Sequence, residues 1–467
     1  MAKKKQNRQN RSRLIPALIA LLAVVGVAGF LAYKKATDYP TSLGDGILDN
    51  ISSAISTDDL DKSWSELVGS SSKPQPKRGF VDDGEYVSKD DSNPFTSVRN
   101  YMSDGAANKY AIAIKKGGMR HTVLNVGVRE LINVKPGGET TYKAGSLEAR
   151  IKNAVDWNKA NPDKKLTVHL RFNVGKAAPD VWKSACGTVD MTDPNFNVKA
   201  TVPRWWLKKS DGSYPYRYFY ENAMKVLGNV VNDINSKADT KNIIGSVNVP
   251  AAAPNYPEPM LLYTASPEVR NNLVRAGFTA REHNRFMMWA PEMAKYFPNV
   301  YVELALNPYQ NIDANGDATN RDKDLYKDVA NKLISVAGSR TVLANYSIRT
   351  SMTLDSAKGN YAEMQNWMFE KGRGKPGVVV GFQMARPQVV SQGLSSSSRD
   401  YEQWDNVAYW AAMRGANFVE TTGPGSGDAI KKAPGMNNVW PNSYSDDSDD
   451  LPAMRRITSK MLSNPIP

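Results

Sequence analysis

Three glutamates stand near the ends of short apolar segments, where acidic side chains could act on a substrate. Glu303 lies within Val300–Asn307, Glu420 lies within Phe418–Gly423, and Glu258 follows another such segment. Two carboxylates facing each other across a pocket can cleave a glycosidic bond, because one protonates the leaving oxygen while the other attacks the sugar or activates water. We therefore expect Glu258 to be the acid and Glu303 or Glu420 to be the base or nucleophile.

The same glutamates also have a structural interpretation. Glu303 could pair with Arg171 inside the fold, and Glu420 could accept a hydrogen bond from a backbone amide. Either interpretation fits the residue types, so both stay open at this point.

Amides, an arginine, an acid and aromatic rings near the same segment ends are candidates for binding a substrate. Amide and guanidinium groups donate hydrogen bonds to hydroxyls, and aromatic rings can stack on apolar faces of sugars, although loop tryptophans are often buried instead. Tyr309 offers a further ring. The predicted substrate-binding residues are Arg171, Asn173, Asp180, Trp182, Trp205, Trp206, Asn248, Tyr256, Asn307, Asn345 and Gln383.

Beyond about Asn93, short apolar segments alternate with amphipathic ones, and these elements must position the candidates. The predicted strands are Thr122–Val128, Leu166–Asn173, Ile243–Val249, Val300–Leu306, Thr341–Ser347, Val378–Met384 and Asn417–Thr421. The predicted helices are Ser146–Lys159, Tyr216–Asn235, Arg281–Phe297, Asp324–Ala337, Tyr361–Lys371 and Tyr401–Arg414. In the second helix apolar residues recur every three or four positions, as an amphipathic helix requires.

Strands and helices that alternate at this spacing form a parallel sheet with right-handed crossovers. Seven clear strands and a weak eighth near Val198–Val202 predict an α/β fold, a (β/α)8 barrel. An open doubly wound sheet is the alternative. It is disfavoured because no glycine-rich dinucleotide loop follows the first strand.

Alternation along the strands predicts which side chains face the inside of the barrel. Residues between the outward apolar positions face inward, and on Thr341–Ser347 this rule places Val342, Ala344 and Tyr346 outside. The predicted inward residues are His169, Arg171, Asn173, Ser246, Asn248, Tyr301, Glu303, Ala305, Asn307, Asn345, Ser347 and Gln383. Their polar members lie toward the carboxyl ends of the strands, where barrel active sites are found, which predicts one convergent polar pocket.

Two segments, Leu170-Arg171-Phe172-Asn173-Val174-Gly175 and Ala178-Pro179-Asp180-Val181-Trp182, resemble a strand end and a Pro-x-Trp loop of glycoside hydrolase barrels in the large retaining clan, especially the β-galactosidase-like ones. Val202-Pro203-Arg204-Trp205-Trp206 and Pro257-Glu258-Pro259 are similar to such barrels too. The resemblance covers roughly residues 120–425 by pattern. It implies O-glycosyl hydrolase activity on a polysaccharide or cell-envelope glycan.

Two positions depart from that clan. Its fourth strand ends in Asn-Glu, the Glu being the acid/base, whereas here Asn248 is followed by Val249. Its nucleophilic Glu ends the seventh strand, where this chain has Gln383. A carboxamide neither attacks an anomeric carbon nor stabilises a developing positive charge. The chain therefore either uses a displaced pair of glutamates or binds a glycan without cleaving it.

Composition excludes several other classes. With one cysteine, Cys186, the chain has no intramolecular disulfide framework, and it contains neither a P-loop nor a GxSxG motif. The net charge is +13, but the charged residues of 1–35 are eight Lys and Arg and no acid, leaving only +5 for the remainder. We expect no nucleic-acid partner and no cofactor.

The positive charge at the N-terminus lies next to a predicted membrane anchor. Leu14–Tyr33 is an uncharged run of 20 residues, long enough to cross a bilayer, and six cations precede it. Basic residues stay on the cytoplasmic side, so we expect an uncleaved single-pass anchor with the main domain outside; a cleavable signal peptide is the alternative. The expected organisation is a cytoplasmic tail (1–13), the anchor (14–33), a stalk (34–92) with a Ser/Pro-rich linker at Gly69–Lys77, the barrel (93–440) and a C-terminal tail (441–467).

The segment from Asp313 to Asp324 mimics a calcium-binding EF-hand loop in part. Ala318 replaces the sixth-position glycine and the twelfth position is Asp rather than Glu, so we predict no metal.

Two functions remain: a membrane-anchored extracytoplasmic glycoside hydrolase, or a catalytically degenerate barrel that binds surface glycan.

Overall fold

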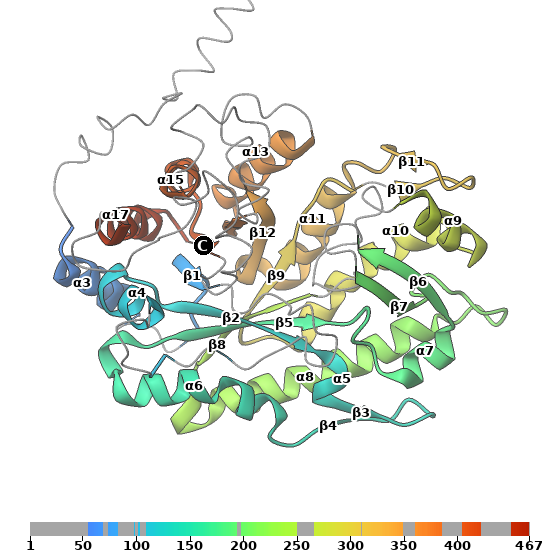
Figure 1. The fold of residues 1–467 in the computed structure, drawn as a ribbon, viewed down its shortest axis with the longest axis horizontal. Coiled ribbons are helices and arrows are strands. Elements are labelled where there is room, and N and C mark those ends of the chain that lie inside the picture. Colours follow the sequence, from blue (N-terminus) through green and yellow to red (C-terminus); the bar gives the residue numbers. More distant parts are fainter. Residues whose placement is uncertain are drawn as a thin grey trace, which may run out of the picture.

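Eight parallel strands form a closed barrel in the computed structural model of this chain (Figure 1). The structure describes residues 55–68, 73–82, 98, 101–102, 109–193, 198–249, 266–309, 311–348, 360–384, 404–421 and 450–466. The predicted anchor, Tyr256 and Glu258 lie outside these residues. No helix in the described part of the chain is both long and apolar enough to span a membrane.

The barrel confirms the predicted fold class and seven of its strands. Around the barrel the order is β1-β14-β13-β12-β9-β8-β5-β2. The strands are β1 (Gly79–Asp82), β2 (His121–Gly127), β5 (Thr167–Asn173), β8 (Ile244–Asn248), β9 (Tyr301–Ala305), β12 (Thr341–Ile348), β13 (Val379–Met384) and β14 (Phe418–Thr421).

The eighth strand is not the predicted one. Val198–Pro203 forms β7, which pairs antiparallel with β6 (Thr188–Asp193) in a separate hairpin. The barrel is closed instead by β1, which pairs with β14 on one side and β2 on the other. This strand has only four residues and follows a Pro-rich segment, so neither its length nor its surroundings produced a strand pattern.

Helices surround the barrel, and six of them confirm predicted ones. These are α6 (Ser146–Ala160), α8 (Pro215–Ser236), α10 (Ala280–Trp289) with its 3-10 continuation η4 (Ala290–Tyr296), α11 (Leu325–Ala337), α13 (Asn360–Gly372) and α15 (Trp404–Arg414). The others are α3 (Thr57–Val68), α4 (Lys109–Gly117), α5 (Val128–Leu131), α7 (Asp180–Cys186), α9 (Pro267–Arg275) and α17 (Asp450–Ser463). Two small hairpins, β3–β4 (Ile132–Val134, Thr140–Tyr142) and β10–β11 (Asn311–Ile312, Ala318–Thr319), lie outside the barrel sheet.

The apolar core has two main parts, one between strands and helices and one inside the barrel. Val168, Leu170 and Phe172 of β5 belong to the outer part, as their alternation predicts. The inner part consists of Val81, Val123, Ala305, Val342, Ala344, Tyr346, Val379 and Phe418. On β12 the predicted facing is therefore wrong, since Val342, Ala344 and Tyr346 point inward. The core of a barrel is apolar in its lower layers, so hydrophobicity alone does not distinguish its two faces.

The predicted stalk and tail both contribute to the folded domain. Helix α17 buries Leu451, Met454, Ile457 and Met461 and packs against α15 and α4, as Figure 1 shows. Helix α3 contacts α17 as well and adds Trp64 to the packing. The boundaries at 92/93 and 440/441 are therefore wrong: a chain beginning at residue 93 would lack β1 and leave β2 and β14 as open edges.

The segment 73–77, interpreted from its composition as a linker, passes against the beginning of β8. A Cβ at Gly245 would lie 2.2 Å from the backbone oxygen of Gln75, so only glycine leaves room for this segment. Pro74, Pro76 and Lys77 are buried there. Proline fixes the backbone without needing an amide partner, which suits a buried connection as well as a flexible one.

Candidate functional site

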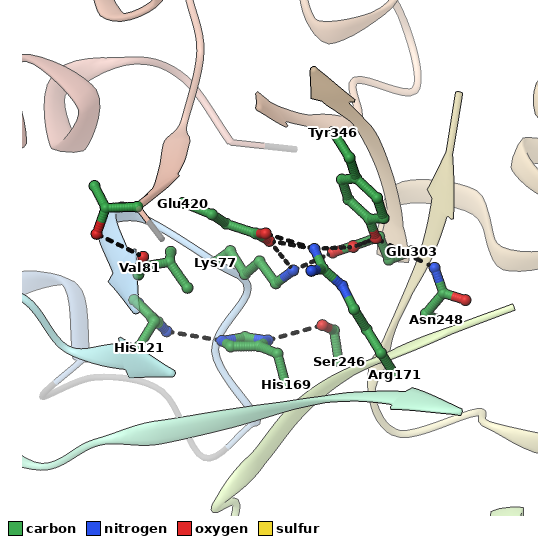
Figure 2. A network of polar contacts seen from close by, with 11 residues as sticks. Lys77, Val81, His121, His169, Arg171, Ser246, Asn248, Glu303, Tyr346 and Glu420 are labelled. Atoms are coloured by element: carbon green, nitrogen blue, oxygen red, sulfur yellow. Dashed lines mark hydrogen bonds and ion pairs between the residues drawn. The ribbon is translucent and has the colours of Figure 1, made fainter. Parts of the chain in front are cut away.

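Lys77, Arg171, Glu303 and Glu420, here called the barrel quartet, form an ion-pair network inside the barrel (Figure 2). The Lys77 Nζ lies 2.5 Å from Glu303 Oε2 and 2.5 Å from Glu420 Oε1. The Arg171 Nη2 lies 2.5 Å from Glu420 Oε2 and 3.3 Å from Glu303 Oε1. Each carboxylate therefore contacts both cations, and the four formal charges cancel.

Three barrel strands and the segment before β1 supply the quartet. Arg171 lies on β5, Glu303 on β9 and Glu420 on β14, while Lys77 precedes β1 by two residues. Strand alternation correctly predicted that Arg171 and Glu303 face inward. Lys77 was missed, because a lysine in a Ser/Pro-rich stretch gives no sign that it is buried.

Tyr346 of β12 and Asn248 of β8 extend this network. The Tyr346 hydroxyl donates a hydrogen bond to Glu303, and the Asn248 side-chain amide donates to the Tyr346 oxygen at 3.3 Å. The Arg171 guanidinium lies over the Tyr346 ring, 3.9 Å from its centre. Such stacking holds a buried arginine in place while its hydrogen bonds point at the carboxylates.

Burial and charge oppose each other in this network. Burial alone would raise the pKa of Glu303, but the charges of Lys77 and Arg171, with hydrogen bonds from Lys77 and Tyr346, outweigh it and hold that pKa below its usual value. Burial would lower the pKa of Arg171, but Glu420, Tyr346 and Glu303 raise it well above the ordinary value. Burial raises the pKa of Tyr346 strongly. Glu303 is thus ionised and Tyr346 is a neutral donor.

This geometry makes the two inward glutamates an internal ion-pair cluster. The side chain of Glu303 is 1% exposed and that of Glu420 is 0% exposed. The Lys77 ammonium contacts both carboxylates and bridges them. The structural interpretation is confirmed for Glu303, which pairs with Arg171. Glu420 pairs with Lys77 and Arg171 rather than with the backbone amide that was predicted as its partner.

A second polar row lies beside the quartet, as Figure 2 shows. His121 Nδ1 and His169 Nε2 are 2.9 Å apart, and His169 Nδ1 is 2.7 Å from Ser246 Oγ. Burial, followed by the charges of Lys77 and Arg78, lowers the pKa of His121 to about 3. Burial likewise places the pKa of His169 well below its ordinary value. Both rings are therefore neutral. The two histidines are far apart in the sequence, and the pairing of β2 with β5 brings them into contact.

The predicted tryptophans are core residues rather than a sugar platform. Trp182 of α7 is fully buried and stacks on Phe219 of α8. Trp205 and Trp206 are 1% and 3% exposed, and Trp205 donates a hydrogen bond to His283 Nδ1 at 3.2 Å. Their burial leaves none of the three rings exposed to a sugar in this structure, and their assignment to substrate binding stays a prediction. Hydropathy patterns do not distinguish a buried tryptophan from one that awaits a ligand.

The remaining predicted binding residues separate into two groups. Asn345 lies on the opposite face of β12 from Tyr346, and its Nδ2 donates to the Leu306 oxygen at 2.9 Å and to Asn307 Oδ1 at 3.4 Å. Tyr309 is buried and Asp180 is exposed at the first position of α7. None of these four faces the quartet.

Asn173, Asn248 and Gln383 lie near the carboxyl ends of their strands, as predicted. Asn173 is the last residue of β5 and shares a face with Arg171, and Gln383 lies beside Glu420 in the strand register. Asn173 is 4% exposed, and neither its amide nitrogen nor its oxygen has a hydrogen-bond partner in the described part of the chain. A buried amide with both groups unsatisfied is costly and suits a position where a ligand binds.

The strand pairing defines a (β/α)8 barrel with ionised and polar side chains in its interior. No protein-family model matches the chain, and no curated protein matches it in sequence. Among solved structures, the catalytic domain of β-amylase from Paenibacillus polymyxa is similar with a TM-score of 0.40 and 9% identity, covering 81% of this chain and 97% of that one.

Two mannanases are similar at the same distant level. The β-mannanase of the blue mussel Mytilus edulis has a TM-score of 0.40 and 12% identity, covering 82% of this chain and 92% of that one. The catalytic domain of the GH26 endo-β-1,4-mannanase from Bacillus sp. JAMB-750 has a TM-score of 0.36 and 8% identity, covering 83% and 88%. These similarities are weak, and the barrel assignment depends on the strand pairing instead.

Proposed function

We propose that this protein is a membrane-anchored, extracytoplasmic barrel that binds a cell-envelope glycan at its carboxyl-terminal mouth without cleaving it. The observation that carries the proposal is the barrel quartet. Glu303 and Glu420, the inward glutamates of the described strands, are neutralised by Lys77 and Arg171 and hidden from solvent. Carboxylates held in this way neither protonate a leaving group nor attack a sugar.

Amide side chains lie near the carboxyl ends of several described strands. Asn173 has unsatisfied donor and acceptor groups, and Gln383 stands where the retaining clan has its nucleophile. Neutral amides bind sugar hydroxyls by donating and accepting at once. This combination favours recognition over chemistry.

Anchoring is part of the same proposal. The uncharged run Leu14–Tyr33 and the six cations before it support a single pass with the N-terminus in the cytoplasm. The barrel would then face the cell envelope, where a glycan ligand is available.

Hydrolysis is the second candidate, with Glu258 as acid and Glu303 or Glu420 as base or nucleophile. One observation favours it: Glu303 is ionised and accepts a hydrogen bond from Tyr346, which is the state a nucleophilic carboxylate needs. This candidate requires Lys77 and Arg171 to release the carboxylate when a substrate binds.

The test uses the full chain in detergent with neutral polysaccharides and peptidoglycan, measuring both binding and new reducing ends. We expect saturable binding with no release of reducing ends. Asn173→Ala should weaken binding by about tenfold, the value of one or two lost hydrogen bonds, while the exposed control Asn299→Ala should not. Release that disappears in Glu258→Gln and Glu303→Gln would instead establish hydrolysis.

A further inference from the structure

An open surface hollow of about 800 Å³ lies outside the barrel, between the beginning of α8 and one face of α10. Three arginines and two aromatic rings dominate its lining. Its main lining residues, here called the α8–α10 pocket, are Tyr214, Arg217, Arg281, Arg285, Trp289 and Glu292. Arg281, Arg285 and Trp289 are spaced four residues apart, so they share one face of the helix.

The acids near this pocket are already engaged. Glu282 Oε1 lies 2.6 Å from Arg285 Nη1, and its Oε2 accepts a hydrogen bond from the Tyr214 hydroxyl at 2.7 Å. Glu292 pairs with Lys332 at 3.0 Å. These contacts leave two arginines of the pocket without an ion-pair partner in the described part of the chain.

Arg217 and Arg281 are those two residues. Neither forms an ion pair with an acid in the described part of the chain, and the buried Nε and Nη2 of Arg217 have no hydrogen-bond partner there. The Arg217 guanidinium lies 4.1 Å from the centre of the Tyr214 ring and 5.5 Å from that of Trp289. Burial lowers the pKa of Arg217, and the more distant carboxylates of Glu282 and Glu292 offset this only in part.

We propose that the α8–α10 pocket binds a sugar that carries an oxyanion, either a carboxylate or a phosphate. Arg217 and Arg281 would hold the oxyanion by charge-assisted hydrogen bonds, and Trp289 and Tyr214 would contact the apolar face of the ring. The sugar part of this assignment depends on the proposed glycan-binding function, whereas the oxyanion part depends on the arginines alone.

The position of the pocket suits an extension of the barrel mouth. Asn284, which also lines the pocket, accepts a hydrogen bond of 2.9 Å from Asn311, in the segment that follows β9. Segments that follow strands lie at the carboxyl-terminal face of a (β/α)8 barrel. A glycan bound at the mouth could therefore place an acidic unit in this pocket.

The test measures binding to the full chain in detergent, by calorimetry and by the change in tryptophan fluorescence. The probes are trigalacturonate, glucose 6-phosphate, inorganic phosphate and, as the uncharged comparison, maltotriose. We expect trigalacturonate or glucose 6-phosphate to bind in a salt-sensitive manner. Arg217→Gln and Arg281→Gln should each weaken binding about ten- to a hundredfold, the loss of a hydrogen bond to a charged group.

Arg373→Gln is the matched control, because Arg373 lines a smaller surface hollow that also contains Glu370. It should leave binding unchanged. Which acidic sugar binds more tightly identifies the oxyanion as carboxylate or phosphate. Affinity that is unaltered in both Arg217→Gln and Arg281→Gln would overturn the assignment, and inorganic phosphate binding as tightly as glucose 6-phosphate would overturn its sugar part.

The failure of the two proposals can be told apart. If Asn173→Ala leaves neutral-glycan binding unchanged while Arg281→Gln abolishes binding of the acidic sugar, the mouth is not the glycan site but the pocket remains one. The converse result removes the pocket and retains the mouth.

Discussion

The barrel quartet and the α8–α10 pocket both contain arginines, but the arginine of the quartet is paired with carboxylates, whereas Arg217 and Arg281 of the pocket are not. Inside the barrel, Arg171 lies under a tyrosine ring and contacts two carboxylates. In the pocket, Arg217 also lies over a tyrosine ring but has no carboxylate within ion-pair distance in the described residues.

This difference separates charge that holds the fold from charge that is available to a ligand. Four buried charges that cancel make a stable cluster, but removing one leaves another uncompensated in a medium of low dielectric constant. Arginines without an ion-pair partner, such as half-buried Arg217 and exposed Arg281, add little to stability through their charge and can gain an anion from outside. Burial together with ion pairing, rather than residue type, distinguishes a structural charge from a charge that can bind a ligand.

The largest expected effect comes from breaking the quartet. Lys77→Met should lower the free energy of unfolding by about 3–5 kcal/mol, because both glutamates would then share only Arg171. Urea denaturation of the full chain measures this.

The exposed Lys62→Met on α3 is the control and should change stability by less than about 0.5 kcal/mol. Adding Glu303→Gln to Lys77→Met should recover part of the loss, because the remaining charges again balance. Equal stability of Lys77→Met and Lys62→Met would contradict the role given to the quartet.

An intermediate effect is expected from acid. The folded-state pKa values of His121 (about 3) and His283 (about 4) lie below the ordinary value of 6.5, so the unfolded chain binds protons that the folded chain does not. Stability should therefore fall as pH decreases below about 6.5, by about 2 kcal/mol for each such histidine between pH 7.5 and pH 5. Urea denaturation at the two pH values measures the loss.

His283→Gln keeps an acceptor for the Trp205 hydrogen bond but does not titrate. Its loss between the two pH values should be smaller than that of the unaltered chain by about 2 kcal/mol. Identical losses would show that His283 does not remain neutral in the fold. Arginines of the α8–α10 pocket do not titrate in this range and contribute nothing to the difference.

The smallest effect concerns the pocket itself. Arg281→Gln should change the free energy of unfolding by less than about 0.5 kcal/mol, because Arg281 is exposed and has no ion pair in the described residues. Thermal unfolding without ligand measures this. A loss of several kcal/mol would place Arg281 with the structural charges and remove the contrast between the two regions.

Local pattern predicted much of the fold and part of the site. The alternation of β5 placed His169, Arg171 and Asn173 on one face, and the structure confirms this arrangement. Alternation predicted this arrangement because successive side chains of a strand point to opposite faces, independently of the rest of the fold. The same rule was wrong for Tyr346, whose large ring looks apolar while its hydroxyl bonds Glu303.

Residues whose environment comes from distant segments could not be predicted in this way. Lys77 contacts carboxylates 226 and 343 positions away, and nothing in its neighbourhood distinguishes it from a lysine in a linker. Trp182 and Trp205 were likewise assigned to substrate binding. Their burial comes from residues of α8 and α10, which are distant in the sequence, so nothing near either tryptophan indicated it. Strand β1 is as short as β14, which was predicted, but it follows a Pro-rich segment whose composition indicated a linker.

The sequence by itself determined the alternation of strands and helices, seven of the barrel strands and the inward position of Glu303, since hydrophobic periodicity is a property of neighbouring residues. Only the tertiary structure decided that β1 closes the barrel, that Lys77 and Arg171 neutralise those glutamates, and that Arg217 and Arg281 remain without an anion in the described part of the chain. The reason is physical: the fate of a charge depends on which charges and how much solvent surround it, and closure of the barrel determines both.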